Sequence, residues 1–400
     1  MSGGITMSEL IYLDNAATTA VKPEVFDAMK PYFLETYSNP SSVYSFAGKS
    51  GEAVEGAREQ IASLIHANSQ GIYFTAGGSE ADNWALKEAA EAQKDKGRHI
   101  ITSQIEHHAV LHTCEWLEKH GYEVTYLPVD ENGLISTEEL EKAIREDTIL
   151  ISIMFANNEI GTIEPIKEIG AIARKHDILF HTDAVQAVGH IPIDVEEMNI
   201  DMLSASGHKF YGPKGIGFLY VREGVRLGAL IHGGAQERSR RAGTHNVPGI
   251  VGMGEAARLA IRNMEENTKK EIKIRDYLIA RLEKEIPFIK VNGHREKRLP
   301  NNVNVCFRFI EGESLLMMLD QKGICASSGS ACTSGSLDPS HVLLAIGLPH
   351  EIAHGSLRMT LSEDTTKENV DYVVESLKEI VEKLRNMSPL YEDYLKDNKN

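Results

Sequence analysis

The apolar positions in the first half of the chain form short, mostly unbroken runs. Seven of these runs have the length and composition of strands: Ile72–Thr75, His99–Thr102, Glu123–Leu127, Thr148–Met154, Ile178–Asp183, Met202–Ser206 and Gly217–Val221. Continuous apolar runs, rather than alternating ones, are typical of strands buried on both faces of a sheet. The pattern therefore predicts a central sheet that is covered on both sides.

Helical patterns separate several of these predicted strands. They cover Ser79–Lys94, Ala109–His120, Thr137–Arg145 and Pro165–His176. Strands that alternate with helices favour a doubly wound α/β fold with a largely parallel sheet. Because a short turn rich in Gly and Pro joins the last two runs, we allow for one antiparallel strand.

The pattern changes after residue 225. A helical stretch covers roughly Gly249–Glu285, and a plausible domain boundary falls at Asn267–Glu271. Alternating apolar residues then predict a half-buried strand: Val303, Val305, Phe307 and Phe309. Another set falls on one face of a C-terminal helix: Val370, Val373, Val374, Leu377, Ile380, Val381 and Leu384. Together these patterns predict a smaller α+β domain.

Composition and charge exclude several functional classes. The chain has 400 residues and a formal charge of −16, which argues against a nucleic-acid footprint. No apolar run approaches the roughly 20 residues that a membrane-spanning helix needs, and residues 1–10 lack the pattern of a signal peptide. We therefore expect a cytoplasmic enzyme whose cysteines are free thiols, with no intrinsic metal site. The four cysteines form no CxxC pair: Cys114, Cys306, Cys325 and Cys332.

Polar residues follow five of the predicted strands. They are Ala76–Glu80, Glu106–His108, Asn157–Glu159, Asp183 with Gln186, and Ser206–Lys209. In open α/β sheets, ligands bind beyond the carboxyl ends of the strands. The five clusters are therefore predicted to meet in one site at one edge of the sheet.

The first cluster suits a phosphate group. Gly77 and Gly78 can expose backbone N–H groups at the start of a helix, and Ser79 can cap it. The alternative is an ordinary turn followed by an N-cap. The segment is neither a GxGxxG motif nor a P-loop, which disfavours nicotinamide cofactors and nucleoside triphosphates.

Three further residues could bind a cofactor with a pyridine ring: Asp183, Lys209 and His107. Asp183 ends a buried run and needs a partner, which a protonated pyridine nitrogen would provide. Lys209 follows another buried run, and a desolvated lysine can form an imine. The alternatives are a structural ion pair for Asp183, a snorkelling side chain for Lys209 and a polar surface position for His107. Taken together, the clusters predict pyridoxal 5′-phosphate, held as an imine on Lys209.

Four motifs give the chain a family resemblance. They are Tyr12–Thr19 (YLDNAATT), Asn157–Gly161 (NNEIG), Ser206–Lys209 (SGHK) and Ser327–Cys332 (SSGSAC). From about Ile11 to Leu390 the sequence resembles the cysteine desulfurases, which are class V, fold-type I pyridoxal-phosphate enzymes, and within them the NifS/IscS-like subgroup with a long cysteine loop. The resemblance implies a large domain over 16–265 with a seven-stranded, mainly parallel sheet. It implies a smaller α+β domain from 1–15 and 266–400, with a mobile cysteine loop at 327–340.

The resemblance also implies roles for individual residues. Lys209 carries the cofactor and moves the substrate's α-proton, His107 stacks on the ring as an acid–base, and Cys332 accepts the sulfur. The cofactor-binding set is Gly78, Ser79, His107, Asn158, Asp183, Gln186, Ser206, His208, Lys209 and, from the second subunit of a dimer, Thr244. The substrate-binding set is Asn39, Asn158 and Arg358, with Arg358 on the carboxylate.

The implied reaction converts L-cysteine to L-alanine and leaves a persulfide on Cys332. The implied partners are a second copy of the chain and a sulfur acceptor such as an iron–sulfur scaffold, whose cluster Cys332 could transiently contact. Alternatives are selenocysteine lysis or transamination on the same fold, or a non-catalytic sulfur-trafficking scaffold. A basic run, Arg238 to Arg241, is either a solvated face or a dimer contact. Cys325 is expected to be a small core residue.

Overall fold

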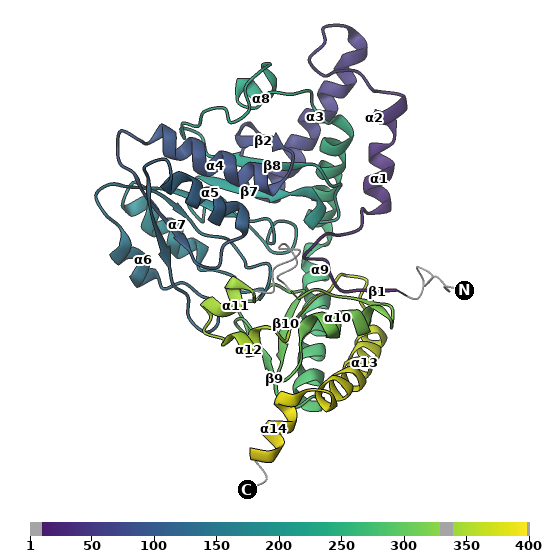
Figure 1. The fold of residues 1–400 in the computed structure, drawn as a ribbon. Helices are drawn as coiled ribbons and strands as arrows, with labels where there is room; N and C mark the ends of the chain where they lie inside the picture. Colours follow the sequence, from purple (N-terminus) through teal and green to yellow (C-terminus); the bar gives the residue numbers. More distant parts are fainter. Residues whose placement is uncertain (1–9, 329–338, 398–400) are drawn as a thin grey trace.

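The computed structural model describes residues 10–328 and 339–397, and this part of the chain forms three sheets, with seven, three and two strands (Figure 1). In the described part of the chain, the larger sheet has seven strands in the order β2-β8-β7-β6-β5-β3-β4. Their bounds are β2 (Ile72–Thr75), β3 (His99–Ser103), β4 (Glu123–Leu127), β5 (Thr148–Ser152), β6 (Leu179–Asp183), β7 (Met202–Ser206) and β8 (Gly217–Val221). All neighbours are parallel except β8, which is antiparallel to both β7 and β2. The predicted mainly parallel sheet with one reversed strand is confirmed.

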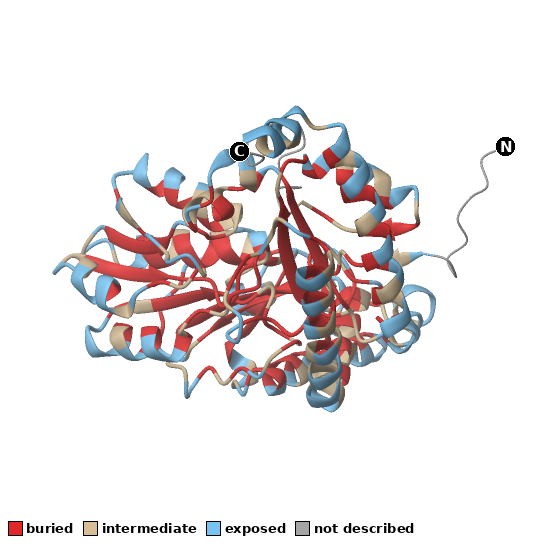
Figure 2. Ribbon diagram, turned by 90° about the horizontal axis from the view of Figure 1, so that it is seen from below, coloured by how far each residue is buried: buried red, intermediate tan, exposed pale blue. Residues whose placement is uncertain are grey.

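Helices cover both faces of this sheet. They are α3 (Ser45–Leu64), α4 (Gly78–Ala92), α5 (His108–Glu118), α6 (Thr137–Ala143), α7 (Ile166–Lys175) and the long α9 (Val247–Glu285). One apolar core joins the sheet to α3, α7 and α9, and another joins it to α4 and α5. Five of the strands are buried at every position, as the continuous apolar runs predicted, and Figure 2 shows buried strands crossing the interior.

Short elements link or flank the larger sheet. They are α1 (Pro23–Met29), α2 (Pro31–Leu34), α8 (Gln236–Ser239) and the 3₁₀ turns η1 (Ser69–Gly71) and η2 (Gly207–Lys209). Helices α1 and α3 pack on α9. This arrangement leaves the carboxyl ends of β5, β6 and β7 facing the second sheet, where the loops after them meet the C-terminal part of the chain.

The second sheet is antiparallel, in the order β12-β10-β9, beside a parallel pair of β1 and β11. The bounds are β1 (Ile11–Tyr12), β9 (Ile289–Val291), β10 (Asn302–Phe307), β11 (Ile324–Cys325) and β12 (Ser356–Thr360). Its helices are α10 (Gly312–Asp320), α11 (His341–Ala345), α12 (His350–Ala353), α13 (Lys367–Asn386) and α14 (Pro389–Asp397). The predicted apolar face of α13 is confirmed, because its apolar side chains lie in the core of this part.

The prediction of a half-buried strand at 303–309 is wrong for β10, which is buried at every position. Its apolar side chains face α9 and α13. Its other face is covered as well, because Asn302 Nδ2 and Asn304 Nδ2 donate to the carbonyl oxygen of Glu159 at 3.2 and 3.1 Å. Phe309 lies beyond the strand with a φ of 72°. The alternation of apolar and polar residues correctly predicted that β10 has one polar face, but it could not indicate that the loop containing Glu159 covers that face.

Helix α9 runs through both halves of the molecule. Val247 and Ile250, near its start, belong to the core of the larger sheet, whereas Leu278 and Leu282 belong to the core of the smaller sheet. The segment Asn267–Glu271 lies inside this continuous helix. Among the described residues, none of the helices combines the length and the apolarity that a membrane crossing requires.

Candidate active site

A cavity of about 280 Å³ lies at the carboxyl edge of the larger sheet. Ten of the predicted site residues line it: Gly78, Ser79, His107, Asn158, Asp183, Gln186, Ser206, His208, Lys209 and Arg358. The remaining wall comes from Ala16, Ala17, Asp82, Met154, Ala156 and Val185. The convergence predicted from the strand ends is therefore observed, and the smaller sheet contributes Arg358.

The loop between β2 and α4 is shaped by close backbone packing. Gly77 has φ 157° and ψ −176°, a region that only glycine adopts readily. A Cβ on Gly78 would lie 2.6 Å from Val185 Cγ2, and one on Gly217 would lie 2.7 Å from Gly77 Cα. The first N–H groups of α4 have no acceptor within the helix, so this end of α4 suits an anion.

A second hollow, of about 480 Å³, opens beside this helix start. Ser79, Ser206 and His208 line both hollows, and Lys214 lines only the second. Hydroxyl groups, backbone N–H groups and a lysine around one space match the needs of a phosphate group. Sequence analysis did not include Lys214 in the site, although it stands in the Gly212–Gly215 turn directly after the lysine motif.

Lys209 reaches the cavity from η2, directly after β7. Its Nζ donates to the carbonyl oxygens of Ala16 and Ala17 at 2.5 and 2.9 Å. The N-terminal segment is held against η2, because the backbone N–H of Thr19 donates to His208 O at 2.9 Å. The amine is therefore oriented by backbone groups of the segment that forms one wall of the site.

Asp183 and His107 face Lys209 across the cavity. Asp183 is buried at the end of β6, and its Oδ1 accepts from the backbone N–H of Val185 at 3.0 Å. Burial raises the pKa of Asp183, while His107 and Lys209 oppose that rise. His107 is the N-cap of α5, and its Nδ1 accepts from the N–H of Ala109 at 3.1 Å. Because burial also lowers the pKa of His107, its ring is neutral at pH 7.

A second buried carboxyl group, Asp82, escaped the sequence analysis. It lies on α4, lines the cavity, and its Oδ1 has no hydrogen-bond partner among the described residues. Burial, together with the nearby Asp183, raises the pKa of Asp82 well above its usual range. A signal existed in the sequence: Asp82 stands among the apolar positions of its helix, three residues before Ala85 and four before Leu86.

His181 lies beside Asp82 on the same face of β6 as Asp183. Its two ring nitrogens pair with Ser152 Oγ at 2.8 Å and Ser204 Oγ at 2.9 Å. Burial lowers the pKa of His181 to about 3, so the ring is neutral and its 3.6 Å approach to Asp82 Oδ1 is not an ion pair at neutral pH. Asp183, in contrast, lies close enough to Lys209 for that positive charge to favour its ionised form.

Arg358 brings a guanidinium group to the cavity from β12. Its Nη2 donates to Asp14 Oδ1 at 3.0 Å and its Nη1 donates to Asn158 O at 3.1 Å. Its Nε is buried and has no partner among the described residues. A guanidinium that is fixed on one side and retains a donor can bind a carboxylate.

Two of the predicted residues that the structure describes, Asn39 and Thr244, are not among those that line this cavity. Asn39 is exposed, and its Oδ1 accepts from the N–H of Ser41 at 3.0 Å. Thr244 lines a separate hollow with Glu237 and Arg241. Cys332 lies outside the described residues. Of the other cysteines, Cys114 and Cys306 are buried and free as expected, whereas Cys325 is only half-buried because it lies on the short β1–β11 pair.

The described residues fit pyridoxal 5′-phosphate. The helix start and its hydroxyl groups provide an anion cradle, Lys209 provides an amine, and Asp183 provides a buried carboxylate for a ring nitrogen. His107 supplies a flat ring on the cavity wall.

Comparisons with known proteins agree with this fit. The family model for class-V aminotransferases matches residues 11–373. A solved NifS-like protein superposes with a TM-score of 0.88 at 40% identity, covering 94% of this chain and 100% of that one. The NifS-like protein of Rickettsia africae superposes with a TM-score of 0.84 at 31% identity, covering 93% and 99%. The fold and the site thus define a class-V aminotransferase, and this family uses pyridoxal 5′-phosphate.

Relatives with curated names narrow the assignment within the class-V aminotransferases. Cysteine desulfurase IscS of Methanosarcina thermophila is 61% identical over 385 residues, which cover 96% of this chain and 95% of that protein. Cysteine desulfurase IscS of Clostridium botulinum strain Hall is 58% identical over 393 residues, covering 98% and 99%. Within the class-V aminotransferases, the chain belongs to the cysteine desulfurases. The family resemblance, the enzyme class and the cofactor expected from the sequence are confirmed.

Proposed function

We propose that this chain takes sulfur from L-cysteine, releases L-alanine and retains the sulfur as a persulfide on Cys332. The main support is the pairing of the strand that carries Arg358 with the start of the cysteine segment. Ser327 N donates to Arg358 O at 3.1 Å, and Arg358 N donates to Ser327 O at 2.5 Å. Cys332 stands five residues after Ser327. An extended chain spans at most about 3.5 Å per residue, so Cys332 can lie up to roughly 17 Å from a residue that adjoins the cavity.

The cofactor and the lysine have separate roles in the proposed reaction. When bound, pyridoxal 5′-phosphate supplies an electron sink for the pair released from the substrate Cα–H bond. Lys209 Nζ would hold the cofactor covalently, and as a free amine it would take the proton from the substrate Cα. Asp183 keeps the ring nitrogen protonated. His107 would stack on the ring. Because its Nδ1 accepts from the N–H of Ala109, the neutral imidazole carries its proton on Nε2 and can donate that proton from there.

The phosphate and substrate groups are assigned to the two ends of the cavity. Gly78, Ser79, Ser206 and His208 bind the phosphate, and Gln186 binds the ring hydroxyl. Arg358 and Asn158 bind the substrate, with the carboxylate on the guanidinium. This orientation leaves the substrate sulfur to be reached by a thiolate from the 327–340 segment.

The sulfur step balances without an added oxidant. The Cys332 thiolate attacks the substrate sulfur, and an S–S bond forms as the Cβ–S bond breaks. The electron pair of the broken bond stays with the substrate carbon, which takes up protons and leaves as alanine. Only the thiolate form of cysteine is nucleophilic, so Cys332 must be deprotonated at the site.

We propose that the enzyme is a homodimer with shared active sites. Asn39 and Thr244 lie outside the cavity of their own chain, which is expected if each completes the site of a partner. Exposed apolar side chains also gather along residues 26–46: Phe26, Phe33, Leu34, Tyr37, Val43, Tyr44 and Phe46. Apolar patches of this kind mark protein interfaces.

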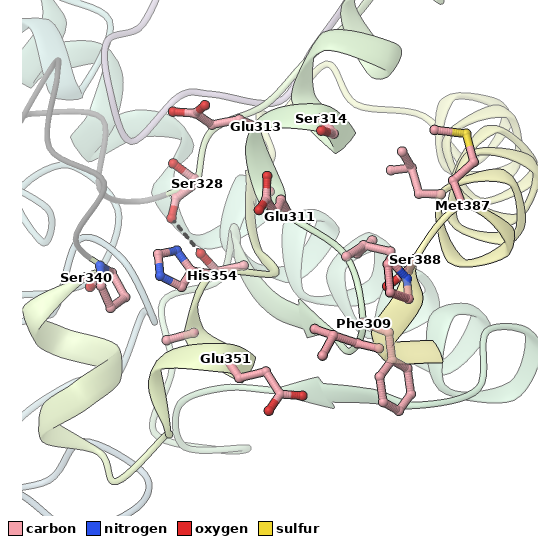
Figure 3. A pocket seen from close by; sticks show the side chains of 18 residues that line it. Phe309, Glu311, Glu313, Ser314, Ser328, Ser340, Glu351, His354, Met387 and Ser388 are labelled. Carbon is pink, nitrogen blue, oxygen red and sulfur yellow. Dashed lines mark hydrogen bonds between the residues drawn. The ribbon is translucent and has the colours of Figure 1, made fainter. Parts of the chain in front are cut away.

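We propose that the sulfur acceptor, an iron–sulfur scaffold or another thiolated partner, docks at a cavity of about 670 Å³ beside α10, α12 and α14. Ser328 and Ser340, which border the cysteine segment, lie on one side of this cavity, and Met387 and Ser388 lie on the other (Figure 3). Two exposed apolar side chains line it, Met387 and Leu390. A partner seated there would lie next to the segment that carries the persulfide.

Two further expectations stay as proposals. The chain divides into a large domain, 16–265, and a small one formed by 1–15 and 266–400, and the two separate cores contacted by α9 support a division within that helix. The cytoplasm is the proposed location, because the described cysteines are free thiols, as a reducing compartment allows.

Two substitutions test the function. Lys209→Ala is expected to remove the visible absorption of the bound cofactor and all turnover. Cys332→Ser is expected to keep that absorption but form no persulfide, as measured by mass spectrometry after one turnover with L-cysteine. Sulfide release by the Cys332→Ser enzyme at the wild-type rate contradicts the assigned acceptor. Assays for selenide from selenocysteine and for amino-group transfer distinguish the alternative reactions.

A further inference from the structure

Residues 327–340 are called the cysteine segment here because they carry Cys332. Both ends of this segment are hydrogen-bonded to residues at or next to Arg358 and Asn158, which form the substrate corner of the cavity. At the first border, Ser327 forms two backbone hydrogen bonds with Arg358, and Ser356 Oγ donates to Ser328 O at 3.0 Å. At the second border, Ser340 Oγ donates to Glu159 Oε2 at 2.5 Å. Glu159 directly follows Asn158, whose carbonyl oxygen accepts from Arg358. One continuous network thus joins the two ends of the segment.

The backbone of Glu159 is held in place by hydrogen bonds that do not involve Ser340. Its backbone N–H donates to Asn157 Oδ1 at 2.9 Å, and its carbonyl oxygen accepts from Asn302 and Asn304 on β10. The residue is 4% exposed. Burial raises the pKa of Glu159, while the Ser340 hydroxyl and the Arg358 charge oppose that rise. A buried carboxyl with a rigid backbone is an effective anchor for a hydroxyl group.

Ser340 also binds the start of a helix. Its Oγ also accepts from the N–H groups of Val342 and Leu343 at 3.1 and 3.3 Å, so Ser340 is the N-cap of α11. The hydroxyl therefore uses its donor on Glu159 and its acceptor on the helix. In Figure 3, Ser340 lies at the edge of the large cavity, close to the start of this helix.

We propose that Glu159 is a positioning residue for sulfur transfer: it holds Ser340, and with it the second border of the 327–340 segment, beside the Arg358–Asn158 substrate corner. This inference rests on the proposed function, because the segment carries Cys332. Fixing both ends of a short segment raises the effective concentration of a group on it at a nearby site. Loss of one anchor lowers that concentration without removing a group that touches the cofactor.

Single-turnover experiments with the holoenzyme and excess L-cysteine separate two events. The change in cofactor absorbance on mixing reports substrate binding and proton removal, and alkylation with mass spectrometry reports the persulfide on Cys332. We expect Glu159→Ala and Ser340→Ala each to slow persulfide formation by about tenfold or more, the order expected when a hydrogen bond is lost and a buried polar group is left without its partner. The absorbance change should stay within about twofold of wild type, because these residues contact neither cofactor nor substrate.

Two controls make the result specific. Glu159→Gln keeps an acceptor for Ser340 and is expected to stay within about threefold of wild type. Ser136→Ala removes another serine N-cap, that of α6, which accepts from Glu139 N at 3.3 Å and lies outside the cavity. This variant should form persulfide at the wild-type rate. The Glu159→Ala/Ser340→Ala double variant should be no slower than Ser340→Ala alone, because Ser340→Ala already removes the shared bond as well as the N-cap of α11.

The outcomes are distinguishable. Persulfide formation at the wild-type rate in Ser340→Ala or Glu159→Ala overturns the inference, and so does an equal slowing of the absorbance change and of persulfide formation. If Glu159→Ala fails to fold, Ser340→Ala compared with Ser136→Ala carries the test. Absence of a Cys332 persulfide in the wild-type enzyme instead contradicts the proposed function itself.

Discussion

Arg358 Nη2 and Asp14 Oδ1 lie 3.0 Å apart, so a carboxylate from the N-terminal segment fixes the guanidinium that faces the cavity. Arg358→Lys keeps the charge but loses the planar fork. We expect kcat/KM for L-cysteine to fall by about ten- to a hundredfold, the range for a lost charged hydrogen bond. Asp14→Asn should produce a smaller loss, because Arg358 then keeps only Asn158 O as an anchor. Steady-state kinetics measure both effects.

The control for these two variants is the visible absorption of the bound cofactor. It should be retained, because neither Arg358 nor Asp14 belongs to the proposed phosphate or ring contacts. A normal KM in Arg358→Lys would remove Arg358 from the substrate-binding set.

Glu237 connects two segments that are far apart in sequence. Its carboxylate accepts from both terminal nitrogens of Arg58 at 2.8 Å and from the N–H of Phe74 at 2.9 Å, and it pairs with His245 Nε2 at 2.8 Å. Although burial opposes ionisation, the hydrogen bonds from Arg58 and His245 lower the pKa of Glu237 to about 2. The network also holds a turn in which Glu237, Arg238 and Ser239 all have positive φ.

We expect Glu237→Ala to reduce the free energy of unfolding by about 3–5 kcal/mol, because it leaves a buried arginine without its main partner. Chemical denaturation measures the loss. Glu55→Gln is the matched control, since Glu55 pairs with the same Arg58 but is exposed, and its loss should be within about 1 kcal/mol. Equal losses in the two variants would contradict the assigned importance of the buried pair.

Glu271 is expected to make the free energy of unfolding depend on pH. It is buried on α9, and burial, with a contribution from Glu363, raises its pKa to about 8. The folded state therefore binds this proton more tightly than the unfolded state does. The contribution of protonated Glu271 to the free energy of unfolding is fully present below the ordinary glutamate pKa and is lost as the pH rises towards about 8. Glu271→Gln should become progressively more stable than wild type across this interval and show a constant difference above it.

Thermal unfolding over this pH range measures the difference. Glu266→Gln, an exposed position on the same helix, should match wild type at every pH. A pH-independent difference between Glu271→Gln and wild type would indicate that Glu271 is ionised in both states.

The exposed apolar side chains of the N-terminal part predict the subunit interface. Leu34 is 83% exposed and Val43 is fully exposed in the single chain. A charged side chain buried at a dimer interface is costly, so Leu34→Asp and Val43→Asp should each shift the enzyme towards monomer. Analytical ultracentrifugation measures this. Met317→Asp, at an apolar position on α10 that is 67% exposed, should leave the association state unchanged.

The sequence alone predicted much of the larger sheet and of the site. Continuous apolar runs placed its seven strands within one or two residues, and the polar residues after five of these runs marked the cavity. This succeeds because strand ends in a parallel sheet converge, so residues such as Asp183 and Lys209 must lie near one another whatever the details of packing. Cys332 was also singled out by its motif, and its role stays a prediction.

Tertiary structure decided the features that join distant segments. The burial of the polar face of β10 and the hydrogen bond between Glu159 and Ser340 arise where the loop after β5 meets the C-terminal part of the chain. The approach of Asp82 to Asp183 arises where α4 packs on β6 of the larger sheet. Sequence periodicity reports which face of an element is polar, but it does not specify what covers that face. The contacts between side chains about 100 to 180 residues apart depend instead on how the helices and loops pack.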